Sequence, residues 1–228
     1  MLFIFFIQFI ISFLFSINEY NPEEGDLVFQ DLDCDSICDA IEDVTSGLCN
    51  AEISHVGIII FKNDSVYVLE AIEGVVKLTL YEEFLNRSLD DSGKPKVMVF
   101  RVKDIYKHLI PDVLKKIDKY LGKHYDYLFD FDNDSIYCSE LIYFLFKEAN
   151  NNNEFFNASP MTFKSSKTGL FNDYWISYFK SYNKEIPEGK SGINPASMTK
   201  SNKLDLIYLF GNIKNAKNEC LLEKLKKN

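Results

Sequence analysis

The sequence has no surplus of basic residues. It carries 25 lysines and arginines against 34 aspartates and glutamates over 228 residues, for a formal net charge of −9 at pH 7. A nucleic-acid-binding protein needs basic patches that neutralise phosphates, so we expect no nucleic-acid partner. The acidic balance identifies no other partner, and solubility is its simplest explanation.

Zinc-binding and redox motifs are also missing. The chain has no Cys-x-x-Cys pair, and its three histidines are scattered. Structural zinc sites draw on closely spaced cysteines and histidines, and thiol–disulfide exchange usually uses a Cys-x-x-Cys pair. We therefore expect no metal site. A redox role would require Cys138 to cycle with Cys34 or Cys49.

Only the N-terminus has a long apolar run. It is broken by Gln8 and Ser12 and ends near Ser16. The run is shorter than the roughly 20 residues of a membrane span, and it lacks a basic leader and an Ala-x-Ala site. It is still typical of a signal-peptide core, so we expect residues 1–17 to be a signal peptide. The protein is then periplasmic or extracellular; the alternatives are an uncleaved membrane anchor and a buried helix.

Five cysteines are an odd number for an exported protein. One thiol must then stay free or pair outside the chain. Cys34 and Cys38 have helical spacing, so they pack, pair with each other, or pair with Cys49. The sequence leaves the pairing of Cys34, Cys38, Cys49 and Cys220 open.

The length suits one domain, and a hydrophobic content of 46% provides a sizeable core. We expect this domain over residues 18–215, followed by a polar, frayed tail at 216–228. Apolar runs and turn signals predict strands at 25–30, 53–61, 65–72, 75–80, 96–102 and 203–211, helices at 35–47, 81–88, 110–122 and 139–150, and loops with short helices over 151–203. This pattern is typical of an α+β fold with an antiparallel sheet packed against helices.

Cys138 lies between an acid-rich loop and a helical pattern in "DFDNDSIYCSELIYFLF". A cysteine attacks as its thiolate, and the free N–H groups and dipole of a helix start favour that anion. Asp130, Asp132 and Asp134 disfavour the anion if they point at the sulfur. On this local sequence alone, a packing cysteine is the simpler interpretation.

The three aspartates also match positions 1, 3 and 5 of an EF-hand calcium loop. Ser135 replaces the glycine of position 6, however, and Leu141 replaces the glutamate of position 12. We therefore favour a loop that leads into the next helix.

A histidine and a glutamate share the predicted hairpin. His55 begins its first strand in "SHVGI", and Glu70 lies in its second strand in "VLEAI". A turn at Lys62 and Asn63 pairs them directly, and a turn one residue later makes them diagonal; both arrangements leave them within reach. A glutamate in an apolar strand is costly unless it is paired, so the two indicate an imidazole base oriented by a carboxylate. This is what a Cys138 nucleophile requires.

Other residues compete for these roles. His124 in "GKHYDY" is a fallback base, and His108 in "YKHLIP" is expected to be solvated. Gln30 and Cys34 in "FQDLDC" faintly resemble a papain-type glutamine and nucleophile, but the papain signature and a downstream histidine motif are missing. Trp175 and its neighbouring aromatics are either pocket wall or core, and core is the commoner use.

Five segments, from about residue 23 to about 211, together resemble the permuted papain-like cysteine hydrolases, the circularly permuted NlpC-type enzymes of the YiiX/YaeF group. The segments are "GDLVFQ", "SHVGI", "VLEAI", "YDYLFDFDNDSIYCSEL" and "INPASMTKSNKLDLIYLF". In ordinary papain-like enzymes the cysteine precedes the histidine. Here the histidine comes first, as in the permuted order.

The resemblance implies a circularly permuted papain-like fold. By matching motifs it also implies Cys138 as nucleophile, His55 as base and Glu70 as the orienting residue. No metal or organic cofactor is required. The substrates it implies are peptide amides, including those of the cell wall, or acyl lipids, and either implies proximity to a wall or membrane.

The resemblance adds two residues around the nucleophile: Tyr137, which lines the site, and Gln30, a further oxyanion donor. From the local pattern alone, Ser139 begins the helix whose N–H groups hold the oxyanion. We therefore predict a cysteine hydrolase of amide or acyl ester bonds. The alternatives are a non-catalytic binding module on the same fold and a lipid acyl hydrolase or transferase. The sequence sets neither the oligomeric state nor the signal cleavage site.

Overall fold

The computed structural model describes residues 20–227. The expected signal peptide, residues 1–17, lies outside these residues. No helix within residues 20–227 is long and apolar enough to cross a membrane.

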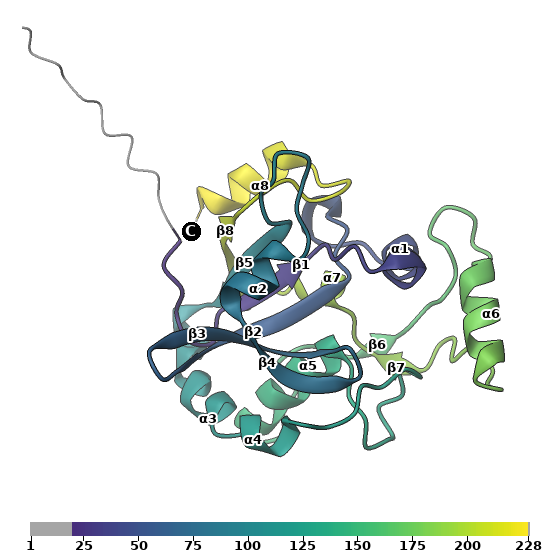
Figure 1. Ribbon diagram of the computed structural model, residues 1–228, viewed down its shortest axis with the longest axis horizontal. Coiled ribbons are helices and arrows are strands. Elements are labelled where there is room, and N and C mark those ends of the chain that lie inside the picture. The colour runs from purple at the N-terminus through teal and green to yellow at the C-terminus, as the bar shows by residue number, and fades with distance from the viewer. Residues whose placement is uncertain (1–19, 228) are drawn as a thin grey trace, which may run out of the picture.

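A six-stranded antiparallel sheet forms the centre of the molecule, with the strand order β4-β3-β2-β1-β5-β8 (Figure 1). The strands are β1 (Leu27–Gln30), β2 (His55–Lys62), β3 (Ser65–Ile72), β4 (Val75–Leu80), β5 (Val97–Val102) and β8 (Leu204–Leu209). Each of them was predicted, and the α+β class with an antiparallel sheet is confirmed. The first strand lies in the middle of the sheet because β1 pairs with both β2 and β5.

The hairpin of β2 and β3 turns one residue later than direct pairing of His55 with Glu70 requires. Lys62 lies opposite Ser65, and the turn residues Asn63 and Asp64 both have positive φ, the geometry of a type I′ turn. Of the two turn positions that the sequence left open, the later one is observed, so His55 and Glu70 are diagonal neighbours across the hairpin.

Glycine is required inside this hairpin at position 57. A Cβ on Gly57 would lie 2.3 Å from Cγ1 of Val68 and 3.4 Å from Cβ of Glu70. The motif "SHVGI" therefore needs its glycine so that β3 can pack closely beside His55.

Helices cover both faces of the sheet. The helix α5 (Cys138–Ala149) packs against β2 and β3 and buries Leu141, Leu145 and Phe146 completely. On the opposite face, Phe84 of α2 (Tyr81–Asn86) packs in a smaller apolar cluster with alternate residues of the strands, namely Val28, Ile59, Val68, Val97 and Val99. Leucine and phenylalanine at helical spacing drive this burial, each side chain contributing about 1.5–3 kcal/mol.

The remaining helices are short. The predicted helix over 110–122 is divided into α3 (Ile110–Leu114) and α4 (Ile117–Tyr120), because the N–H of Lys116 bonds to the carbonyl of Val113 in a tighter turn. The helix α1 (Asp35–Val44) has Cys34 at its N-cap and ends three residues before the predicted end at residue 47. The other elements are η1 (Leu48–Asn50), η2 (Asp104–Leu109), β6 (Ser159–Pro160), α6 (Asp173–Ser181), β7 (Ser191–Gly192) and α7 (Pro195–Met198).

The C-terminal tail is ordered, contrary to the prediction of a frayed end. It forms α8 (Asn218–Leu225), whose Leu221 is fully buried. A disulfide joins Cys220 to Cys49, with the two Cα atoms 5.8 Å apart. The many lysines of the tail indicated a frayed end, although Leu221 and the disulfide of Cys220 hold it to the domain.

Candidate active site

His55 and Glu70 form a buried pair at the start of β2. His55 Nε2 and Glu70 Oε2 are 2.6 Å apart, and the residues are 4% and 0% exposed. The diagonal register brings them together because both side chains point to the face of the sheet that α2 covers. Sequence reasoning placed this pair correctly within reach.

Two residues that the sequence analysis missed hold the Glu70 carboxylate. Arg87 Nη1 and Nη2 donate to its two oxygens at 2.9 and 2.7 Å, and Thr79 Oγ1 donates to Oε1 at 2.5 Å. Burial alone would raise the pKa of Glu70, but the hydrogen bonds and charges of His55 and Arg87 lower it to about 2. Glu70 is therefore a fixed carboxylate at any ordinary pH.

Gln30 supports Arg87 rather than an open oxyanion site. It lies opposite His55 on β1, and its Oε1 accepts a hydrogen bond from Arg87 Nε at 2.8 Å. Its Nε2 donates to the carbonyl of Phe84 at 2.9 Å, so this donor is already used. The expectation of an oxyanion donor changes because strand alternation turns Gln30 toward α2, where the guanidinium lies 4.4 Å above the Phe84 ring.

Cys138 is the first residue of α5, and its side chain forms a hydrogen bond with His55. Burial alone would lower the pKa of His55, but its hydrogen bonds to Cys138 and Glu70 raise it above the ordinary value. These hydrogen bonds therefore favour the charged form of the His55 imidazole. A cysteine, a histidine and a carboxylate follow one another in contact, the arrangement of a catalytic triad.

Cys138 also has the free thiol among the cysteines. Cys34 bonds to Cys38 and Cys49 bonds to Cys220, and each pair is within the usual span of a disulfide. The rival nucleophile Cys34 therefore has no thiol to offer.

The aspartates before the helix face water or a lysine. Asp132 and Asp134 are exposed, and Asp130 Oδ2 lies 3.2 Å from Lys190 Nζ. Asp126, which is buried, accepts hydrogen bonds from two N–H groups of the loop and shapes it. The loop therefore leads into the helix without its exposed carboxylates opposing a charge on the sulfur.

One buried acid lies in the same first turn of α5 as Cys138. Glu140 is 1% exposed, and its Oε2 accepts the backbone N–H of Tyr137 in half of a capping box. Burial and the nearby charge of Asp126 raise the pKa of Glu140 to about 9. The side chain is therefore neutral near pH 7 and leaves the helix start positive.

Tyr137 and Ser139 fasten a neighbouring loop to the helix start. Ser139 Oγ donates to the carbonyl of Ile193 at 3.0 Å, and the Tyr137 hydroxyl accepts from the N–H of Ile193 at 3.2 Å. Both residues line a cavity beside Cys138, as does Pro195 of the "INPASM" segment. Their hydroxyls are engaged, so what they can offer a substrate is shape, together with the backbone N–H groups of the first helical turn.

Tyr125 is a further residue of this site that the sequence analysis missed. It bridges to Ile136, two residues before Cys138, and lines the same cavity. Burial raises the pKa of Tyr125 well above its ordinary value, and the charge of Cys138 adds to this. The phenol therefore stays protonated beside the sulfur. The motif "GKHYDY" drew attention to its histidine, but His124 is exposed.

His108 is exposed as well, and its Nδ1 lies 2.9 Å from the carbonyl of Ile105. Neither of the two other histidines, therefore, stands where it could serve Cys138 as a base. Among the described residues 20–227, this leaves His55 as the imidazole of the site.

A solved structure has the same fold. The crystal structure described as that of the metalloprotein YiiX from Escherichia coli O157:H7 superposes with a TM-score of 0.67 and 24% sequence identity. The match covers 83% of this chain and 98% of that one. At this identity the likeness establishes the fold alone.

The residues of this site do not fit a metal ion. No group of three or more His, Cys, Asp or Glu side chains within residues 20–227 is arranged to hold one. Both oxygens of Glu70 are taken by Arg87, Thr79 and His55, so the carboxylate has no free ligand position.

The sequence also matches a curated relative and a family. The "uncharacterized protein YiiX" of Escherichia coli K12 is 30% identical over 143 residues, which are 61% of this chain and 66%, just under two thirds, of YiiX. Residues 21–208 match the family described as the permuted papain-like amidase enzymes, YaeF/YiiX, C92. With the histidine before the cysteine and the site assembled as above, this chain belongs to the permuted papain-like amidase family.

Proposed function

We propose that this protein is a cysteine hydrolase that cleaves an amide bond through Cys138, His55 and Glu70. The observation that carries the proposal is the buried row of thiol, imidazole and carboxylate, in which Arg87 and Thr79 fix the carboxylate. A lone packing cysteine needs no such network. Membership of an amidase family supports the same chemistry.

The reaction follows from the positions of these groups. His55 takes the proton of Cys138, and Glu70 stabilises the imidazolium that results. The thiolate attacks the substrate carbonyl and forms a tetrahedral intermediate. His55 then gives its proton to the leaving amine as the C–N bond breaks, which leaves a thioester on Cys138. Water, with His55 as base, hydrolyses the thioester and restores the thiol.

The oxyanion would be held at the start of α5. The first N–H groups of a helix have no partner within the helix, and the helix dipole favours negative charge there. The Tyr125 hydroxyl, kept protonated by its burial, is a second donor at the same place.

Other functions have less support. A non-catalytic binding module would not need Arg87 and Thr79 to fix the Glu70 carboxylate against His55. A redox cycle of Cys138 with Cys34 or Cys49 has less support, because Cys34 is bonded to Cys38 and Cys49 to Cys220 rather than to Cys138. An acyl ester would react by the same steps, so an acyl-lipid hydrolase or transferase remains the second candidate, favoured by the apolar lining of the cavity.

We also propose that the protein is exported, so that its substrates are peptide amides of a cell wall or acyl groups at a membrane. Two disulfides support this, since such bonds form and persist in oxidising compartments.

Alkylation tests whether His55 activates the thiol. Under non-reducing conditions Cys138 is the one cysteine thiol that iodoacetamide can alkylate, and intact mass follows the reaction. At pH 6 we expect His55→Ala to be alkylated at least about tenfold more slowly than the wild type, because the base is gone. His108→Ala, an exposed control, should match the wild type. Equal rates for His55→Ala and wild type would refute the activation of Cys138 by His55.

A further inference from the structure

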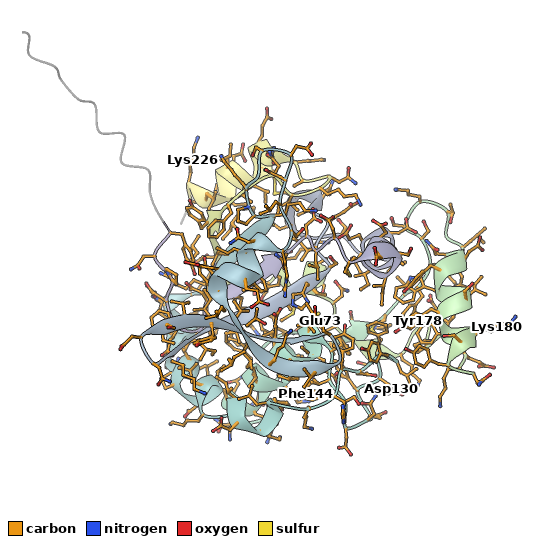
Figure 2. All side chains as sticks on the ribbon, viewed as in Figure 1. Glu73, Asp130, Phe144, Tyr178, Lys180 and Lys226 are labelled. Atoms are coloured by element: carbon orange, nitrogen blue, oxygen red, sulfur yellow. A yellow bond between two sulfur atoms is a disulfide. The ribbon has the colours of Figure 1, made fainter. Side chains whose placement is uncertain are left out.

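A cavity of about 120 Å³ opens beside Cys138, and none of Glu70, Thr79 and Arg87 lines it. Its walls come from α1, from the loop before α5 and from the segment that carries α6. The apolar side chains in the wall include Ile41, Val44, Phe129, Met161, Phe163 and Trp175. The helix α6 stands away from the sheet in Figure 1, and in Figure 2 its Tyr178 points back toward the body of the molecule while Lys180 points outward.

The aromatic part of the wall is rigid. Trp175 is 1% exposed, contacts the ring edges of Phe129 and Phe163, and donates from Nε1 to the carbonyl of Ala40 at 3.3 Å. The contact with Ala40 ties α6 to α1 across the cavity. The size of the space is therefore set by packed side chains on two different elements.

Four polar side chains of the wall already have hydrogen-bond partners within the protein. Thr45 Oγ1 donates to the carbonyl of Ile41 at 2.8 Å, and Thr162 Oγ1 donates to Glu188 at 3.0 Å. Asn194 Oδ1 accepts the N–H of Ser197 at 2.7 Å, and Ser139 is bound to Ile193. Apart from the Tyr125 hydroxyl, the Asn194 amide and the N–H groups at the start of α5, a ligand group in this space meets mainly hydrocarbon and aromatic carbon, which an apolar group matches best.

The volume limits the size of that group. A dry apolar cavity of about 150 Å³ in another protein holds one benzene molecule. A space of about 120 Å³ therefore suits a phenyl ring or an isobutyl group and is too small to enclose a long acyl chain.

We infer that the substrate carries one compact apolar group, aromatic or branched aliphatic, on the carbonyl that Cys138 attacks, and that this cavity binds it. The inference rests on the proposed function for the reaction and adds the substrate class. Two sources share this chemistry: the side chain of an apolar aminoacyl residue, and a short or branched fatty acyl group.

Trp175 is the single tryptophan of the chain, so its fluorescence reports occupancy without any turnover. We would titrate the full-chain Cys138→Ala variant with acetamide, 3-methylbutanamide, phenylacetamide and decanamide, and with the amides of N-acetylleucine and N-acetylphenylalanine. We expect phenylacetamide and 3-methylbutanamide to bind at least about tenfold more tightly than acetamide. Decanamide should gain nothing over them. Tighter binding of the two N-acetylaminoacyl amides would identify the aminoacyl source, and weaker binding the short acyl source.

Filling the cavity gives the matched test. Val44→Phe in the Cys138→Ala background should weaken phenylacetamide binding at least about tenfold and leave acetamide unchanged, whereas Ile176→Ala, at an exposed apolar site of α6, should change neither. Circular dichroism would verify that each variant is folded. If Val44→Phe does not fold, the comparison of the amides on the Cys138→Ala protein still tests the inference.

No change in Trp175 emission with any amide would overturn the inference, as would affinity that keeps rising to decanamide. The wild type separates this outcome from failure of the proposed function. If it hydrolyses none of these amides while Trp175 shows the size preference, the cavity stands and the hydrolase does not. If the wild type hydrolyses the amides but Trp175 shows no size preference, the hydrolase stands and the inferred role of the cavity does not.

Discussion

Cys138→Ala is expected to lower kcat/KM for amide hydrolysis by at least about 10³-fold, because the covalent step has no other nucleophile. The oxyanion donors and the cavity would remain and account for any residual rate. Cys138 is the free thiol, and no other cysteine can replace it without reduction of a disulfide.

Stability provides the control for this variant. Cys138 is 5% exposed, and replacing it with alanine removes one sulfur atom at a helix start, so the free energy of unfolding should change by no more than about 1 kcal/mol. Urea denaturation and initial rates on the same preparation check both statements. Activity within tenfold of the wild type in a folded Cys138→Ala protein would contradict Cys138 as the nucleophile.

Glu70→Gln is the second change with a large expected effect. It removes the charge that balances Arg87 and the imidazolium of His55 in a buried setting, so we expect a loss of stability of about 2–4 kcal/mol at pH 7. The lower part of the range allows for Arg87, whose side chain is 20% exposed and partly screened by water. The rate should fall by about 10²–10⁴-fold, because a neutral amide no longer stabilises the charged base.

The pH dependence of stability gives this prediction a sign. The pKa of Glu70 is lowered to about 2 in the folded protein, below the ordinary value of 4.5, so its contribution is fully present above about pH 4.5. That contribution is lost as the pH falls toward 2. The difference in unfolding free energy between wild type and Glu70→Gln should therefore shrink as the pH is lowered from 5 to 3.

The pH dependence of the rate separates a catalytic effect from a merely structural one. Glu70 helps raise the pKa of His55, so Glu70→Gln should let the imidazolium lose its proton at lower pH. The alkaline limb of the kcat profile then moves to lower pH. Glu73→Gln is the matched control: Glu73 lies just beyond the same strand, its side chain is 75% exposed (Figure 2), and its partner is the surface residue Lys77. That control should change stability by less than about 0.5 kcal/mol. If Glu70→Gln and Glu73→Gln had the same stability and the same kcat profile, the proposed role of Glu70 in orienting and charging His55 would be wrong.

The sequence was sufficient for what depends on local pattern. Alternating β-branched residues located the hairpin, and the polar residues His55 and Glu70 stood out within it because an unpaired charge there would be costly. The helix behind Cys138 was equally clear from its apolar spacing. The order of these three residues along the chain then indicated the permuted family, which the match over residues 21–208 confirms.

What the sequence could not provide depends on contacts between distant segments. Arg87 follows a short surface-like helix, and nothing local indicates that its guanidinium turns inward to Glu70. Thr79 gave a weak signal, as a polar residue at an inward position of "VVKLTL". Gln30 was noticed but placed wrongly in space, since its partner Arg87 was not known. The sequence left two positions open for the turn of the hairpin, and the structure places it at Asn63 and Asp64, which both take the left-handed conformation.

Trapping of an acyl-enzyme tests the central claim most directly. Wild-type protein would be mixed with phenylacetamide or with the 4-nitrophenyl ester of phenylacetic acid, quenched with acid at early times, and analysed by intact mass and peptide mapping. We predict one phenylacetyl group on Cys138, which decays as product forms and is absent from Cys138→Ala. Turnover without any adduct on Cys138, or an adduct that maps to another residue, would contradict the account.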